Sequence, residues 1–232
     1  MMTEIKKLGM ISLCLLSAGC ASQMSNYPPA EKLDPQYTQG NADQLFETGE
    51  KYAKGMGVTR NYAEAAKYYR GAAQMGNPKA QYALGYMYRT GHGVPRDYNV
   101  AAQWFERAAS QGNSDAQYSL GVRYMLGQGT AQDYSRALQW FEKAADQGNP
   151  YAENQLGFMY AAGKSVPQNY GTSIQWYQKA ANHGLASAQY NLGLMYANGI
   201  GTPVDKAKAK ELFEMAAAKG FDPARQALGQ SS

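Results

Sequence analysis

The stretch from Ala80 to Gly112, AQYALGYMYRTGHGVPRDYNVAAQWFERAASQG, decides the fold of this chain. In its first part, apolar side chains recur at spacings of three and four residues, at Ala80, Leu84 and Met87. The same spacing returns in the second part, where Ala101 and Phe105 fall on one face. Such spacing predicts two amphipathic helices, and the intervening Gly-His-Gly predicts a turn between them.

The pattern of this stretch returns every 36 residues. A glycine that lies inside the first predicted helix costs about 1 kcal/mol relative to alanine, so its repetition indicates that another helix approaches closely there. Paired aromatic and Ala-Ala positions of the second predicted helix keep the same step. The mid-helix glycines are Gly49, Gly85, Gly121, Gly157, Gly193 and Gly229.

A pair of helices of this kind cannot bury its apolar faces alone, and stacked neighbours bury them. We therefore predict an all-α solenoid of five helix-turn-helix units. A capping helix and tail over 223–232 follow, with Asp222 as the N-cap. The predicted units span 43–79, 80–115, 116–151, 152–187 and 188–222.

The unit, with its Leu-Gly, Gly-x-Gly, Trp-Phe and Ala-Ala signatures, resembles the Sel-1-like repeat, a relative of the tetratricopeptide repeat. The period is 36 instead of 34, and Gln81, Gln117 and Gln189 stand where the tetratricopeptide repeat has tryptophan. The resemblance implies a right-handed α/α solenoid whose first helices line a concave face. It also implies protein–protein interaction, usually in scaffolding or regulation.

The N-terminal segment has the features of a secretory leader. Lys6 and Lys7 precede the apolar stretch 8–18, which is too short to cross a bilayer as a helix. The sequence from Leu16 to Cys20 resembles the lipobox of bacterial lipoproteins; an ordinary signal peptide is the alternative. We expect a signal peptide over 1–19, then lipidated Cys20 and a flexible tether over 20–42. Because Ala21 is not aspartate, the resemblance implies an outer-membrane lipoprotein, which we expect to face the periplasm in a bacterial envelope.

The first predicted helices carry aromatic side chains opposite their core face. On a helical wheel, Tyr82, Tyr86 and Arg89 lie about 140° to 200° from Leu84, where a polar face is usual. We predict that this face and its repeat equivalents bind a peptide or helix of a partner protein in the groove. The alternative is that the rings only pack against adjacent first helices. The predicted groove residues are Tyr82, Tyr86, Arg89, Tyr118, Val122, Asn154, Phe158, Tyr190 and Leu194.

Residues for catalysis or metal binding are scarce. The only histidines are His92 and His183, neither of which has an evident acidic or nucleophilic neighbour in the sequence, and both cysteines lie within residues 1–20. No serine begins an S-x-x-K motif, and K-T-G is absent. We therefore expect no catalytic residues, no metal site and no cofactor. The net charge of +4 is modest and forms no basic stripe, so we expect no nucleic-acid partner.

The leading functional hypothesis is a non-enzymatic lipoprotein adaptor that binds a segment of a partner protein and is held at the membrane by its lipid. An immunity protein that neutralises a secreted antibacterial effector, such as a phospholipase, is the alternative. A cell-wall or β-lactam hydrolase, suggested by cysteine-rich relatives, is a lesser one. The sequence leaves open the partner, the choice of role, periplasmic or surface orientation, and the oligomeric state.

Overall fold

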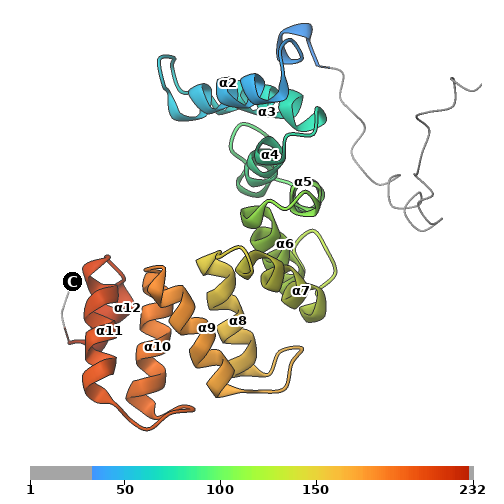
Figure 1. The fold of residues 1–232 in the computed structure, drawn as a ribbon. Coiled ribbons are helices and arrows are strands. Elements are labelled where there is room, and N and C mark those ends of the chain that lie inside the picture. The colour runs from blue at the N-terminus through green and yellow to red at the C-terminus, as the bar shows by residue number, and fades with distance from the viewer. Residues whose placement is uncertain (1–32, 230–232) are drawn as a thin grey trace, which may run out of the picture. The chain divides into compact units, whose positions relative to one another are not determined.

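The structure, a computed structural model, describes residues 33–229, which lie in one compact unit. The predicted signal peptide, Cys20 and the first part of the predicted tether lie outside the described residues. Within 33–229 every regular element is a helix (Figure 1). No helix in this range is long and apolar enough to span a membrane.

Five helical hairpins follow one another along the described chain, and each packs against the next. Within a hairpin the two helices are extensively in contact, and the second helix of each hairpin also contacts the first helix of the next. The predicted all-α solenoid of five repeats is therefore confirmed. The helices are η2 (Pro35–Tyr37), α2 (Ala42–Lys54), α3 (Tyr62–Gln74), α4 (Pro78–Thr90), α5 (Tyr98–Ser110), α6 (Ser114–Leu126), α7 (Tyr134–Ala145), α8 (Pro150–Ala162), α9 (Tyr170–Asn182), α10 (Ala186–Asn198), α11 (Lys206–Ala218) and α12 (Asp222–Ala227).

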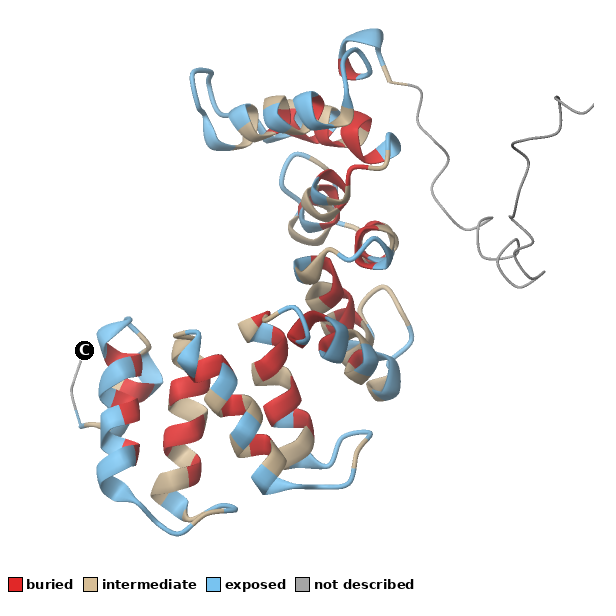
Figure 2. Ribbon diagram, in the orientation of Figure 1, coloured by how far each residue is buried: buried red, intermediate tan, exposed pale blue. Residues whose placement is uncertain are grey.

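The glycine inside each first helix allows close packing within the hairpin. A Cβ atom at Gly85 would lie 2.8 Å from the Phe105 ring, and one at Gly121 would lie 2.7 Å from the Phe141 ring. The close approach predicted from the sequence is thus confirmed at these two glycines. The prediction is wrong for Gly229, which follows α12 with a φ of 70° and where a Cβ would meet nothing within 4 Å. Figure 2 shows the buried residues on the helix faces that meet neighbouring helices.

Polar residues at fixed repeat positions join consecutive hairpins. The Asn77 side chain caps α4 by accepting from the Ala80 amide at 2.8 Å, and its Nδ2 donates to Asp43 on α2 at 2.7 Å. The buried Gln81 donates through Nε2 to the Ala73 carbonyl at 3.1 Å, and its Oε1 accepts from Gln111 at 2.7 Å. Since a buried polar group must be hydrogen-bonded, these residues fix the register between repeats.

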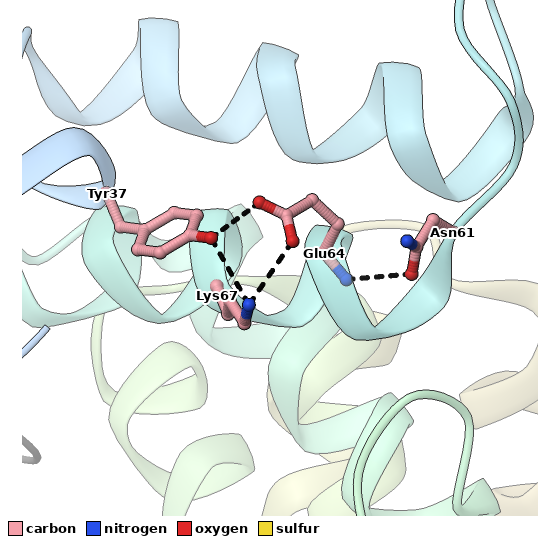
Figure 3. Close-up of polar contacts among 4 residues, drawn as sticks. All are labelled: Tyr37, Asn61, Glu64 and Lys67. Carbon is pink, nitrogen blue, oxygen red and sulfur yellow. Dashed lines mark hydrogen bonds and ion pairs between the residues drawn. The ribbon is translucent and has the colours of Figure 1, made fainter. Parts of the chain in front are cut away.

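The N-terminal end of the described chain packs onto the first repeat. Tyr37 of η2 is buried and donates from its hydroxyl to Glu64 on α3 at 2.6 Å, while Lys67 donates to the Tyr37 hydroxyl at 3.3 Å (Figure 3). Asn61, in the same view, caps α3 by accepting from the Glu64 amide. Within the last part of the predicted tether, η2 is therefore held against α3 through Tyr37.

The C-terminal helix begins one residue earlier than predicted. Phe221 occupies the N-cap position of α12 without a side-chain cap, and Asp222 is the first helical residue. The Asp222 carboxylate instead forms an ion pair with Arg225 at 3.0 Å. Phe221 takes this position because its ring packs on Tyr190 of α10, with ring centroids 5.5 Å apart.

Candidate functional site

The predicted groove residues lie on α4, α6, α8 and α10, and the structure divides them by exposure. Tyr82, Tyr118 and Tyr190 are half-buried. Each ring lies against the phenylalanine of the second helix in its own hairpin: the centroid separations are 5.8 Å to Phe105, 6.0 Å to Phe141 and 5.5 Å to Phe213. These three tyrosines therefore contribute to the packing of the hairpins.

The same tyrosines also meet the next hairpin. The Tyr118 ring lies 5.6 Å from that of Tyr151 at the start of α8. Burial raises the pKa of Tyr118, and a polar contact with the Gln155 side chain opposes that rise. In the fourth hairpin, where the equivalent position is Asn154, its Oδ1 accepts from Asn191 of α10 at 3.1 Å. This column of residues thus forms the seam between successive first helices.

A second column of predicted groove residues faces outward. Tyr86 is 41% exposed and Phe158 is 42% exposed, although both are large and apolar. Val122 and Leu194 hold the equivalent positions on α6 and α10 and are half-buried. The Arg89 guanidinium lies over the Tyr86 ring, 4.7 Å from its centroid. These side chains give the first helices an accessible, partly apolar face.

The scaffold tyrosine near the end of each first helix lies at the edge of the core. Arg70 donates to the Tyr88 hydroxyl at 2.8 Å, and Lys208 lies 4.4 Å from the centroid of the Tyr196 ring. Both rings are partly buried against core clusters. Each ring thus joins apolar packing on one side to a cation on the other.

The two histidines lie apart and make different contacts. His92 stacks on Tyr62 with ring centroids 5.2 Å apart, and His183 lies 3.6 Å from Glu153. Among residues 33–229, no three His, Cys, Asp or Glu side chains are grouped so that they could hold a metal ion. The contacts of the described histidines assemble no nucleophile with a base.

Arg123 is a buried residue that the sequence analysis did not identify. It stands on α6 where Met87, Met159 and Met195 stand on α4, α8 and α10, and only 4% of it is exposed. Its guanidinium lies 5.7 Å from the centroid of the Tyr98 ring, and its Nε and Nη1 atoms have no hydrogen-bond partner. The replacement of methionine by arginine at the 36-residue step is the sequence signal that would have found it.

Glu153 is a second departure from a buried column. It replaces the glutamine found at Gln81, Gln117 and Gln189, and its Oε2 is buried without a partner. Burial raises the pKa of this carboxyl, and the nearby His183 and Lys179 oppose that rise. Glutamate has no amide N–H, so as a carboxylate it cannot make the donation to a carbonyl that Gln81 makes.

Comparisons with known proteins relate the chain to other helical repeat proteins. A Sel1 repeat protein from Oxalobacter formigenes is 37% identical, with a TM-score of 0.77 over 82% of this chain and 77% of the other. A protective antigen of uropathogenic Escherichia coli with an SLR fold is 38% identical, with a TM-score of 0.73 over 82% of this chain but only 42% of its own length. Immunity protein Pa5087 from Pseudomonas aeruginosa is 25% identical, with a TM-score of 0.55 over 87% of this chain and 72% of the other. A search of curated proteins finds no match.

The family model described as Sel1 repeat matches five consecutive segments of the chain. They are 45–77, 78–113, 114–149, 150–185 and 186–221. Together they cover more than half of the chain and coincide with the five hairpins. The chain therefore belongs to the Sel1 repeat family.

Proposed function

We propose that this protein is a non-enzymatic adaptor that holds a segment of a partner protein against its first helices. The observation that carries the proposal is the column of Tyr86, Val122, Phe158 and Leu194, one residue from each of four consecutive repeats. In this column the Tyr86 and Phe158 rings are exposed, and Val122 and Leu194 are half-buried. Exposed aromatic rings supply large contact areas and are enriched among the residues that dominate binding energy. A repeat domain of the Sel1 family suits this role, because its successive units extend one surface along the partner.

A capture experiment tests the role of this column. The bait is the repeat domain, and the sample is a bacterial envelope extract analysed by quantitative mass spectrometry. The double variant Tyr86→Ala/Phe158→Ala should lose the captured partner. The matched control is Met75→Ala/Met215→Ala, which truncates similarly exposed apolar residues outside the first helices and should retain it. Equal capture by wild type and the first variant would contradict the proposal.

The proposal includes attachment to the outer membrane through lipidated Cys20, with the repeats facing the periplasm. Its support is the leader-like sequence, with Lys6 and Lys7 before an apolar stretch that ends at Cys20. Metabolic labelling with an alkyne fatty acid should label the wild type, and Cys20→Ser should abolish the label. Labelling that persists in Cys20→Ser, or that is absent from wild type, would refute lipidation at this residue.

A second candidate function is immunity against a secreted antibacterial effector. It is favoured by the resemblance to two immunity proteins of Pseudomonas aeruginosa, Pa5087 and PA5088, both 25% identical to this chain. In this role the captured partner would be a toxin, and expression of the chain would protect cells against that toxin. A partner that is not toxic when produced alone in the periplasm would decide for the adaptor.

A further inference from the structure

Arg123 carries a charge that the surrounding protein does not balance. A buried guanidinium loses hydration worth several kcal/mol unless acidic or polar groups replace it. Among the described residues no carboxylate forms an ion pair with Arg123, and two of its donor atoms are buried without an acceptor. Methionine at the equivalent positions fills the same space without this cost, so the packing does not require an arginine.

A second arginine lies close to the first. Burial is the main cause that lowers the pKa of Arg123. The positive charge of Arg89, at the end of α4, is close enough to lower that pKa further. Arg89 stacks on the exposed Tyr86 ring and also forms no ion pair with a described residue. The exposed Arg96 lies 5.7 Å from the Tyr98 ring that Arg123 also contacts. The seam between the second and third repeats therefore holds several arginines, and neither Arg89 nor Arg123 forms an ion pair with a described residue.

This concentration is confined to one seam of the solenoid. At the positions of Arg89 and Arg123, the fourth repeat has Ala161 and Met159. The fifth repeat has alanine and methionine at the same two positions. The arginine pair, defined as Arg89 and Arg123, is thus a local feature placed on a regular scaffold.

We propose that the arginine pair binds a side-chain carboxylate of an acidic segment in a partner protein, with Tyr86 packing against the apolar residue beside that acid. The inference rests on the proposed adaptor function and specifies the chemistry of its partner. A guanidinium and a carboxylate form charge-assisted, often bidentate hydrogen bonds. The half-buried Arg89 offers donors for such a contact, and the negative charge of the partner would offset the unbalanced charge of the buried Arg123. Charge complementarity identifies the occupant, while the modest net charge of +4 and the apolar column beside the pair disfavour a nucleic acid.

Selection from a random peptide library tests the inference without knowledge of the natural partner. Peptides selected on the wild-type repeat domain should be enriched in Asp and Glu next to an apolar residue. Their binding should fall by about ten- to a hundredfold in Arg89→Gln/Arg123→Met, because charge-assisted hydrogen bonds are lost. Changing the peptide acid to its amide should cause a similar loss in wild type and little further loss in that variant. The control Arg136→Gln removes an exposed arginine of α7 and should leave binding unchanged.

The outcomes separate the two proposals. The carboxylate site would be overturned if the selected peptides depend on Tyr86 and Phe158 but are not enriched in acids. It would also be overturned if they bind the arginine variant as tightly as wild type. Either result would leave the adaptor proposal standing. A library that yields no peptide dependent on Tyr86 and Phe158 would count against both. A single-stranded oligonucleotide that binds as tightly as the acidic peptide, with the same dependence on the arginine pair, would replace the acidic segment by a nucleic acid. Met at position 123 is the residue that the scaffold carries elsewhere, so the variant is expected to fold, and circular dichroism checks this.

Discussion

Replacing the buried Glu153 with glutamine should stabilise the protein at neutral pH. In the equivalent positions, Gln81 and Gln117 donate through Nε2 to the carbonyls of Ala73 and Ala109, at 3.1 Å and 3.2 Å. Glu153 stands at the same eight-residue distance from Ala145 but, as a carboxylate, has no hydrogen to donate. Glu153→Gln therefore restores a buried hydrogen bond and removes a buried charge.

The size of the gain follows from three contributions. A restored hydrogen bond contributes about 1 kcal/mol, and relief of an unsatisfied buried acceptor contributes about 1–3 kcal/mol. The loss of the contact with the half-exposed His183, at 3.6 Å, subtracts at most about 1 kcal/mol. The expected net gain is about 1–3 kcal/mol, or a rise in Tm of about 2–12 °C for a chain of this size.

The gain should depend on pH in a definite direction. Burial raises the folded-state pKa of Glu153 above its usual value of 4.5, so the folded chain binds this proton more tightly than the unfolded chain. Wild type therefore loses stability as pH rises from about 4.5 through the raised folded value, whereas glutamine does not titrate. The advantage of Glu153→Gln should be small near pH 4 and largest at neutral pH.

Urea unfolding followed by circular dichroism, in steps from pH 4 to pH 8, measures this difference. His183→Gln alone should give no comparable gain. In the preceding repeat, Gln147 donates through Nε2 to the Oε1 of Gln117 at 2.7 Å. The double variant Glu153→Gln/His183→Gln recreates this pair of glutamines and should be at least as stable as the single variant. Equal stability of Glu153→Gln and wild type at pH 7, or a gain that is the same at pH 4, would refute the reasoning.

Three further substitutions test the packing scheme by urea unfolding. Gly121→Ala should destabilise by about 1–3 kcal/mol despite the better helix propensity of alanine, because its Cβ would lie 2.7 Å from the Phe141 ring; a gain would show that the helices can separate without cost. Ser165→Gly should stabilise by up to about 1 kcal/mol, because Ser165 has a φ of 63°, a left-handed conformation that glycine adopts freely; a clear loss would mean that its hydrogen bond with Ser135, at 2.6 Å, matters more. Arg123→Met should stabilise by about 1–3 kcal/mol by removing an unpaired buried charge, and a loss would indicate a partner for Arg123 within the chain.

The fold could be predicted from the sequence because the residues that shape each hairpin recur at the same positions in five repeats. The mid-helix glycine, as at Gly85, marks a contact with the aromatic ring of the second helix, and its recurrence fixes the period of the solenoid. The turn glycines end each first helix in a left-handed conformation, as Gly91 does with a φ of 80°. One copy of these signals would be weak, whereas five in register leave little choice of architecture.

The environment of the predicted groove residues could not be predicted in the same way. A helical wheel describes one helix against one core. A first helix inside the solenoid packs against its own second helix, against the preceding second helix and, through side chains such as Tyr118, against the next first helix. That last neighbour covers Tyr118, whose ring meets Tyr151 across the seam, although the wheel places Tyr118 opposite the core. Tyr86, four residues beyond Tyr82 on the same helix, is exposed. The difference in burial between these two tyrosines can be predicted only when the positions of the neighbouring hairpins are known.

The two polar residues that interrupt buried columns differ in a way that bears on function. At Glu153, the residue that it contacts also departs from the repeat pattern. His183 stands where Gln111 and Gln147 stand in other repeats, and its contact with Glu153 offsets part of the buried charge. At Arg123 no such change is present: after burial, the group that most affects its pKa is another arginine, Arg89. A substitution balanced inside the scaffold needs no external explanation. Because the charge at Arg123 is unbalanced in the free chain, and Arg89 lies over the exposed Tyr86 ring, the acid that complements the arginine pair is expected to come from the partner.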